Sequence, residues 1–306
     1  MNEAQLEQII RDVLAEALPR EKLQSEAAGA VDKKTVPVSL PVGLFPTSLP
    51  PDRPSCVRAE GWVHQLDSPR IAAAVDLLQA KTSSQIAVGR AGTRFPTELY
   101  LRTREGHADA RDAVHSEVAD SWAAEHGCVA LQTQCRERHE YLLYPNHGRR
   151  LDDPSKGKLA SCARGADVQV IVGDGLSPNA ITANGKATFT AVNAALASAG
   201  FSLGTPVFVK FARIGVADEI GVTVGARATV ILVGERPGLG TGDSLSIYIA
   251  VKPRLEQDNA EKNCISNVRP IGIRPDEAAA LTATIVKLGF ERGGGGVALG
   301  YGFTRQ

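Results

Sequence analysis

The chain has 306 residues, of which 43% are hydrophobic and 22% are charged, a composition typical of a soluble globular protein with one large domain or two smaller ones. Its 34 basic residues balance 34 acidic residues, which excludes binding to nucleic acid or to an anionic membrane through bulk charge. The five cysteines are widely spaced and contain no C-x-x-C pair, so the sequence indicates neither a disulfide framework nor a zinc cluster.

The first segment, residues 1–18, has the pattern of an amphipathic helix. Its apolar residues, among them Leu6, Ile10 and Leu18, recur at steps of three and four, and charged residues occupy the opposite side. This acidic start is unlike a secretory signal, and no apolar run in the chain reaches the roughly 20 residues of a membrane span. We therefore expect a cytoplasmic protein with no membrane partner.

A proline-rich linker is predicted next, over residues 19–57, because prolines at 37, 41, 46, 50, 51 and 54 interrupt any regular period. An isolated helix as short as the one at residues 1–18 is marginal in water and gains stability only by docking. It either folds back onto its own domain or acts as a tethered docking peptide. The long linker favours the second interpretation.

The sequence predicts a small helical domain over residues 58–125. Residues 70–80 are strong helix formers, and a second predicted helix includes residues 109–125, in which His115 and Trp122 would share one face. Several arginines precede that second helix: Arg90, Arg94, Arg102 and Arg104. They bind a phosphate or an acidic partner surface, or they are simply solvated, which is the more frequent state of scattered arginines.

Two short β-like runs follow, at residues 129–132 and 140–144. The run H-E-Y-L-L at His139 resembles the start of a zincin motif, but position 143 is leucine instead of the second histidine, so no metal site is predicted. No G-x-S-x-G motif occurs, and all six histidines precede the apolar strands of the C-terminal half, which excludes a hydrolase triad within that half. We therefore assign no catalytic and no metal-binding residue.

The C-terminal half alternates strands and helices. Apolar runs predict strands at residues 168–172, 206–211, 229–233, 245–251 and 265–268. Helices are predicted around residues 189–196 and from Pro275 onward. This alternation implies right-handed crossovers and a mostly parallel sheet, so residues 126–306 are predicted to form a Rossmann-like, three-layer α/β domain.

Three of these strands end in glycine-containing loops, at residues 174–177, 213–215 and 234–240. In open sheets of this kind, ligands bind beyond the carboxyl ends of the strands, so we expect the loops to lie together as a ligand surface. None of them fits a nucleotide fingerprint because G-x-G-x-x-G is absent, and the alternative for each loop is a simple turn. Glu235 is the polar group that the last loop presents.

Several motifs of the C-terminal half resemble the small subunit of ethanolamine ammonia-lyase. They occur in order along the chain: D-V-Q-V-I-V-G-D-G-L-S (167–177), G-T-P-V-F-V (204–209), V-I-L-V-G-E-R-P-G-L-G (230–240), D-S-L-S (243–246) and N-C-I-S-N (263–267). The resemblance implies adenosylcobalamin-dependent conversion of ethanolamine to acetaldehyde and ammonia by a radical route. It also implies a hetero-oligomer in which a TIM-barrel large subunit holds the substrate, while the small subunit covers the corrin and is inactive alone.

The same resemblance implies cobalamin contacts at Ile214, Glu235 and Cys264. The first two lie in the strand-end loops, whereas for Cys264 the residues alone indicate a packed thiol. The family has valine at the position of Ile214, a difference of one methylene that a van der Waals contact tolerates. The D-x-H-x-x-G motif of proteins that displace the lower base of cobalamin is absent, so we expect base-on adenosylcobalamin, with the base on cobalt.

By the same resemblance, residues 1–18 are expected to direct the protein to a bacterial microcompartment by binding its shell or cargo. Two other functional classes stay open at this point. One is a non-catalytic Rossmann-like scaffold or docking protein of a microcompartment, and the other is a stand-alone enzyme that acts on another small molecule. The glycine-rich tail at residues 289–306 has no assigned role.

Overall fold

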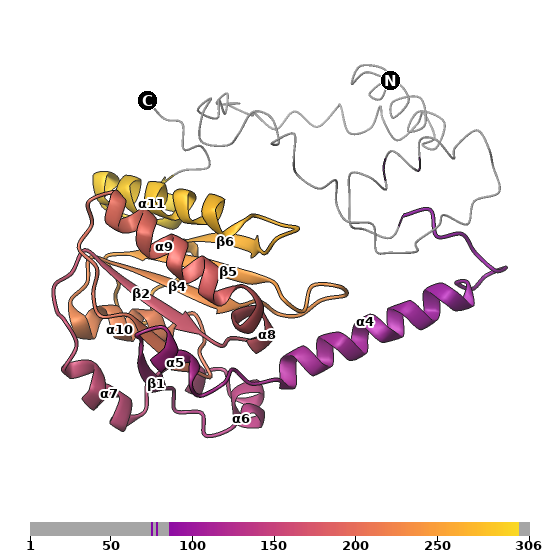
Figure 1. Ribbon diagram of the computed structural model, residues 1–306, viewed down its shortest axis with the longest axis horizontal. Coiled ribbons are helices and arrows are strands. Elements are labelled where there is room, and N and C mark those ends of the chain that lie inside the picture. Colours follow the sequence, from indigo (N-terminus) through magenta and orange to yellow (C-terminus); the bar gives the residue numbers. More distant parts are fainter. Residues whose placement is uncertain (1–74, 76–77, 79–85, 300–306) are drawn as a thin grey trace, which may run out of the picture. The chain divides into compact units, whose positions relative to one another are not determined.

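The computed structural model describes residues 86–299, together with Val75 and Leu78 (Figure 1). The chain divides into two units, and all described residues belong to the second, residues 40–306. The predicted N-terminal helix and proline-rich linker lie outside the described residues. Val75 and Leu78 are both helical, in agreement with the helix predicted around them.

Six strands form one mixed sheet with the order β1-β3-β2-β4-β5-β6. The strands are β1 (Val129–Gln132), β2 (Val168–Gly173), β3 (Val207–Lys210), β4 (Ala228–Gly234), β5 (Leu245–Val251) and β6 (Lys262–Val268). The first four strands pair in parallel, whereas β5 pairs antiparallel with both β4 and β6. The prediction of a mixed α/β fold with a mostly parallel sheet is confirmed, and its Rossmann-like detail stays a prediction.

Strands β2 and β4 form the buried centre of the sheet, and both are buried at every residue. Continuous aliphatic runs of this kind are typical of strands covered on both faces. Side chains alternate along them: Val170 and Leu232 pack into one core cluster, while Ile171 and Ile231 pack into a second. The sheet therefore separates two hydrophobic cores.

Four helices cover the two faces of the sheet: α7 (Asp153–Ala160), α9 (Lys186–Ser198), α10 (Val216–Val224) and α11 (Pro275–Arg292). Helices α9 and α11 lie on one face and contribute to the first cluster, whereas α7 and α10 lie on the other (Figure 1). Helix α11 begins at Pro275, as predicted, and ends at Gly293, whose φ of 74° is a left-handed conformation suited to glycine. The result is a three-layer arrangement.

The remaining helical segments are short, apart from α4. They are α4 (Thr97–His115), α5 (Trp122–Glu125), α6 (Arg138–Leu143), η1 (His147–Arg149), α8 (Pro178–Ala180), the π-helical η2 (Ile181–Gly185), η3 (Asn259–Glu261) and η4 (Gly296–Leu299). Helix α5 packs with the sheet, since Trp122 and Ala123 belong to the first core cluster. The proposed domain boundaries themselves stay a prediction.

The β-like run predicted at residues 140–144 is wrong, because this segment belongs to helix α6. Arg138 and Tyr141 lie three residues apart, so a helix places both on one face, and both are buried. Tyr141 donates a 3.0 Å hydrogen bond to the carbonyl of Ala212. These tertiary contacts override the local β propensity of the run.

The second predicted helix is also wrong in its extent, because it is interrupted between α4 and α5. Helix α4 ends at His115, and Ser116 is extended, with φ −68° and ψ 167°. The Ser116 hydroxyl instead donates a 2.8 Å hydrogen bond to the carbonyl of Ala113 at the helix end. His115 and Trp122 therefore share no helix face, and the Trp122 ring stacks on His126 with centroids 4.2 Å apart.

Candidate ligand-binding site

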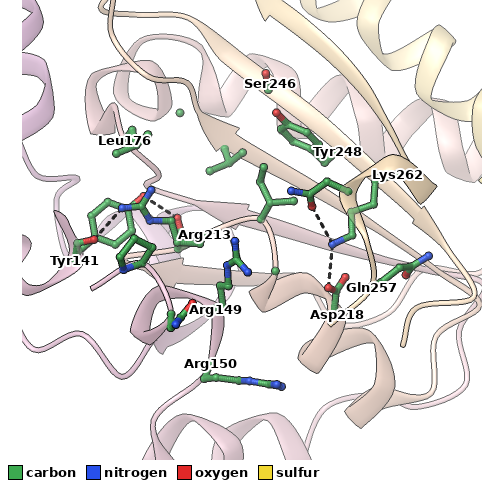
Figure 2. A pocket seen from close by; sticks show the side chains of 18 of the residues that line it. Tyr141, Arg149, Arg150, Leu176, Arg213, Asp218, Ser246, Tyr248, Gln257 and Lys262 are labelled. Carbon is green, nitrogen blue, oxygen red and sulfur yellow. Dashed lines mark hydrogen bonds and ion pairs between the residues drawn. The ribbon is translucent and has the colours of Figure 1, made fainter. Parts of the chain in front are cut away.

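The loops that follow β2, β3 and β4 line one cavity of about 1090 Å³ at the carboxyl edge of the sheet (Figure 2). Leu176 comes from the first loop, residues 212–215 from the second, and residues 233–236 from the third. Carboxyl ends of neighbouring parallel strands meet at one edge, which is where open α/β sheets bind ligands. The expectation that these three loops lie together is confirmed.

Glu235, which directly follows β4, lines this cavity with its carboxylate already held in place. Its oxygens accept hydrogen bonds from the hydroxyls of Ser244 (2.6 Å) and Ser246 (2.5 Å) and from the backbone N–H of Asn267 (2.9 Å). Desolvation raises the pKa of Glu235, but these bonds and the charge of Arg269 outweigh it, so the pKa is lowered. A carboxylate has about four acceptor positions, so Glu235 keeps capacity for about one further donor.

The two other predicted contact residues take different positions. Ile214 is half-buried in the turn before α10, where it lines the cavity and packs against the second core cluster. Cys264 is exposed on β6, opposite Tyr248 of β5, and its sulfur lies 3.9 Å from the Ser246 hydroxyl. Tyr248 and Ser246 both line the cavity, so Cys264 lies next to the wall without belonging to it.

Sequence reasoning missed the basic loop, residues 145–150, which forms another wall of the cavity. The backbone N–H of Arg213 donates a 2.8 Å hydrogen bond to the carbonyl of Gly148 and so ties the basic loop to the loop after β3. Figure 2 shows Arg149 pointing into the cavity. The adjacent pair Arg149–Arg150 directly after a turn was the one available signal.

A buried polar network lies beneath these loops and fixes their positions. Arg138 of α6 donates hydrogen bonds of 2.8 and 3.1 Å to two carbonyls of the loop after β2, and its guanidinium lies 3.7 Å from the carboxylate of Asp174. Asp174 in turn accepts a 3.0 Å hydrogen bond from the backbone N–H of Ala212. Burial raises the pKa of Asp174 to about 6, against the opposing effects of Arg138 and of backbone donors.

A second buried pair lies at the other side of the cavity, where Lys262 of β6 meets Asp218 of α10. The ammonium and carboxylate are 2.9 Å apart, and both side chains are almost fully buried (Figure 2). Burial raises the pKa of Asp218, while Lys262 opposes that rise. Removing one partner of such a pair typically costs about 3–5 kcal/mol because it leaves an uncompensated buried charge.

The described residues offer no alternative type of site at this edge. Among them, no three His, Cys, Asp or Glu side chains gather in an arrangement that would hold a metal ion. No helix in the described part of the chain is both long enough and apolar enough to cross a membrane. The main feature is therefore a cavity whose lining combines fixed carboxylates with several guanidinium groups.

The fold and the cavity define an α/β protein with a cavity at the carboxyl edge of its sheet. A family model described as "Ethanolamine ammonia-lyase light chain (EutC)" matches residues 72–300. The chain therefore belongs to the family of ethanolamine ammonia-lyase light chains, and the resemblance found in the sequence is confirmed. A light chain of a lyase implies a larger partner subunit.

Proposed function

We propose that this chain is the small subunit of an adenosylcobalamin-dependent ethanolamine ammonia-lyase and that its cavity contacts the cofactor. The observation that carries the proposal is the position of Ile214 and Glu235. The family resemblance nominates both as cofactor contacts, and both line the cavity at the carboxyl edge of the sheet. Family membership favours this function over a non-catalytic scaffold.

The cavity suits the size of a corrinoid. Typical small-molecule sites have volumes of about 300–1,000 Å³, and this cavity, at about 1090 Å³, lies above that range. The absence of a side chain at Gly234 lets the loop after β2 pack against the end of β4, since a Cβ there would lie 2.0 Å from the carbonyl oxygen of Ser177. This packing fixes the position of Glu235, the next residue.

The hydrogen-bonding groups of the cavity also suit a corrinoid, because the rim of a corrinoid carries amide groups that can donate hydrogen bonds. Glu235 accepts a hydrogen bond from one of these amides, because its carboxylate keeps about one acceptor position. Ile214 supplies an apolar contact, and Cys264 packs beside Ser246 at the edge of the site. When bound, adenosylcobalamin supplies the radical chemistry of the reaction, while these residues bind and orient it.

We propose that the chain binds and orients the cofactor and contributes no catalytic residue. The resemblance implies that the substrate and the catalytic residues lie on the large subunit. The cavity carboxylates support this division, since Glu235 and Asp218 are each engaged by partners within the chain. The lower base of the cofactor is proposed to stay on cobalt, and a histidine nitrogen coupling in the cobalt(II) EPR spectrum would contradict that.

The test is reconstitution of the enzyme from separately purified subunits. We expect the large subunit to copurify with this chain and the complex to show a cobalamin absorption spectrum. The complex should release ammonia and acetaldehyde from ethanolamine, whereas this chain with adenosylcobalamin should release neither. Turnover by the single chain, or an active large subunit that gains nothing from this chain, would refute the proposal.

Residues 1–18 are proposed to direct the assembled enzyme into a bacterial microcompartment. The support is the amphipathic pattern of these residues, together with the proline-rich linker that separates them from the rest of the chain.

A further inference from the structure

The carboxylates that line the cavity are all engaged within the described part of the chain. Asp218 pairs with Lys262 (2.9 Å), Glu256 with Arg150 (2.9 Å), Glu235 with Ser244, Ser246 and Asn267, and Asp258 with the backbone N–H of Ala260 (2.9 Å). The same contacts use two of the cavity's basic side chains, Lys262 and Arg150. Asp218 and Glu256 are therefore paired with cations, whereas Glu235 and Asp258 are held by neutral donors.

Three guanidinium groups of the lining have no carboxylate partner among the described residues: Arg149, Arg213 and Arg236. Arg149 makes no side-chain hydrogen bond or ion pair with a described residue, although its charge reaches Asp218 and opposes the rise of that pKa. Arg213 donates a 2.9 Å hydrogen bond to the carbonyl of Tyr141 and lies 4.3 Å from the centre of its ring. The Nε of Arg213 is buried and has no hydrogen-bond partner in the described part of the chain.

Arg149 and Arg213 belong to the same wall of the cavity. The hydrogen bond from Arg213 to Gly148 places the two segments side by side, and a Cβ on Gly215 would lie only 3.2 Å from Cγ of Arg149. Figure 2 shows Arg149 pointing into the cavity and the guanidinium of Arg213 lying against Tyr141, which also lines the cavity. Each of the two segments thus brings a cationic side chain to this wall, and an anion bound there would offset their like charge.

We propose that Arg149 and Arg213 form a binding site for a phosphoryl group within this cavity. The planar guanidinium fork matches the oxygens of a phosphate, and such charge-assisted bonds are stronger than neutral ones. One source of the group is the cofactor, since cobalamin carries a phosphodiester in its nucleotide loop, and to that extent the inference rests on the proposed function. The other source is a separate phosphate ligand, which presents the same chemistry.

The first experiment compares two corrinoids that differ by one phosphoryl group, adenosylcobinamide and adenosylcobinamide phosphate, in the reconstituted complex. The wild-type complex should prefer the phosphate form. Arg149→Ala should weaken binding of that form about tenfold and leave adenosylcobinamide within about twofold, because one charge-assisted hydrogen bond is lost. Arg149 is exposed and has no hydrogen-bond or ion-pair partner among the described residues, so this variant is expected to fold, and Arg149→Lys should recover part of the preference.

Arg164→Ala is the matched control, since Arg164 is an exposed arginine that does not line the cavity and whose guanidinium donates to the carbonyl of Thr223. It should leave the preference for the phosphate form unchanged. An equal loss in Arg164→Ala would mean that the effect comes from net charge, and it would overturn the assignment to the guanidinium groups of the cavity.

The second experiment identifies the source with inorganic phosphate as probe. Phosphate, compared with chloride at equal ionic strength, should raise the melting temperature of the full chain and should do so less for Arg149→Ala. Stabilisation by phosphate without a corrinoid preference supports a separate phosphate ligand, whereas the corrinoid preference supports the cofactor. Absence of both effects overturns the site, while a complex that binds no corrinoid at all contradicts the proposed function alone.

Discussion

Glu235 shows how much of this site is organised before any ligand arrives. Its carboxylate is oriented by two serine hydroxyls and one backbone N–H from three different positions of the chain. A group that is already fixed loses little conformational entropy when it binds, which favours affinity. The sequence identified Glu235 from its place after a strand, but its partners become visible only when β5 and β6 bring them to the same edge.

Glu235→Ala is expected to weaken cobalamin binding to the reconstituted complex by about 10- to 150-fold, because a hydrogen bond with one charged partner contributes about 1.5–3 kcal/mol. Glu235→Gln should cost less, since a carbonyl acceptor remains. Ser244→Ala is the control, because it removes one support of the carboxylate without removing the acceptor, and its effect should be at most a few-fold. Cofactor titration measures the affinities, and wild-type affinity in an assembled Glu235→Ala complex would remove Glu235 from the site.

The raised pKa of Asp174 predicts that this group lowers the stability of the chain as the pH rises. Most carboxylates have a lowered pKa in the folded state and act in the opposite direction. Its pKa is about 6 in the folded chain, against an ordinary value of about 3.9. Between these values the folded state binds more protons than the unfolded state, so this group's contribution falls as the pH rises. The shift of about two units corresponds to about 3 kcal/mol lost between about pH 4 and pH 7.

The comparison with Asp174→Asn isolates this contribution, since asparagine does not titrate. Urea unfolding at several pH values should show the wild-type chain losing about 3 kcal/mol relative to the variant as the pH rises from about 4 to 7. If the stability difference between the two proteins stays constant over that range, Asp174 keeps its ordinary pKa in the folded chain.

At the level of elements, strands of the central sheet were predictable and short helices were not. The aliphatic runs of β2 and β4 carry their own signal, because burial on both faces demands apolar residues at every position. Helix α6 has no such signal, since its stability comes from Arg138 and Tyr141 reaching partners far along the chain. The basic loop was missed for the same reason, because its place beside Arg213 depends on contacts between distant segments, among them the hydrogen bond from the backbone N–H of Arg213 to Gly148.

Gly234, at the end of β4, links the stability of the strand end to the geometry of the cavity. A Cβ there would lie 2.0 Å from the carbonyl oxygen of Ser177 and 2.8 Å from that of Asp174. Gly234→Ala therefore forces the loops apart, and we expect it to destabilise the chain by about 3 kcal/mol and to weaken cofactor binding by displacing Glu235. Thermal unfolding and cofactor titration measure the two effects.

Gly157 provides the matched control for this substitution. It lies in helix α7, and a Cβ at this position would meet no atom within 4 Å. Gly157→Ala should stabilise the chain by about 0.5–1 kcal/mol, because alanine loses less backbone entropy in a helix. A destabilisation of equal size in both variants would contradict the argument from close approach.

At the scale of the whole molecule, the proposed function gives the chain two separate tasks. The described residues line a cavity with oriented acceptors and with guanidinium groups that have no carboxylate partner among them, and the chain belongs to a family of light chains. We propose that residues 86–299 complete a cofactor site with the large subunit and that residues 1–18 locate the complex in the cell.

Deletion of residues 1–39 should therefore separate location from catalysis. The family match covers residues 72–300, all of which the deletion keeps, so the remaining residues 40–306 should fold and retain activity with the large subunit. A fluorescent fusion that lacks residues 1–39 should disperse in the cytoplasm of a host that makes microcompartments. A deletion that unfolds the remaining chain, or one that leaves the localisation unchanged, counts against the targeting proposal.

A pair of substitutions tests the same segment at unchanged length. Ile9→Glu with Val13→Glu places two charges on the apolar side of the predicted helix and should abolish localisation, because docking of such a helix relies on that side. Glu7→Gln with Glu16→Gln changes only the polar side and should preserve it. Fluorescence microscopy reports the location and ammonia release reports the activity, and both double variants should keep wild-type turnover. Loss of localisation in the polar-side variant alone would assign the docking to charge instead of the apolar side.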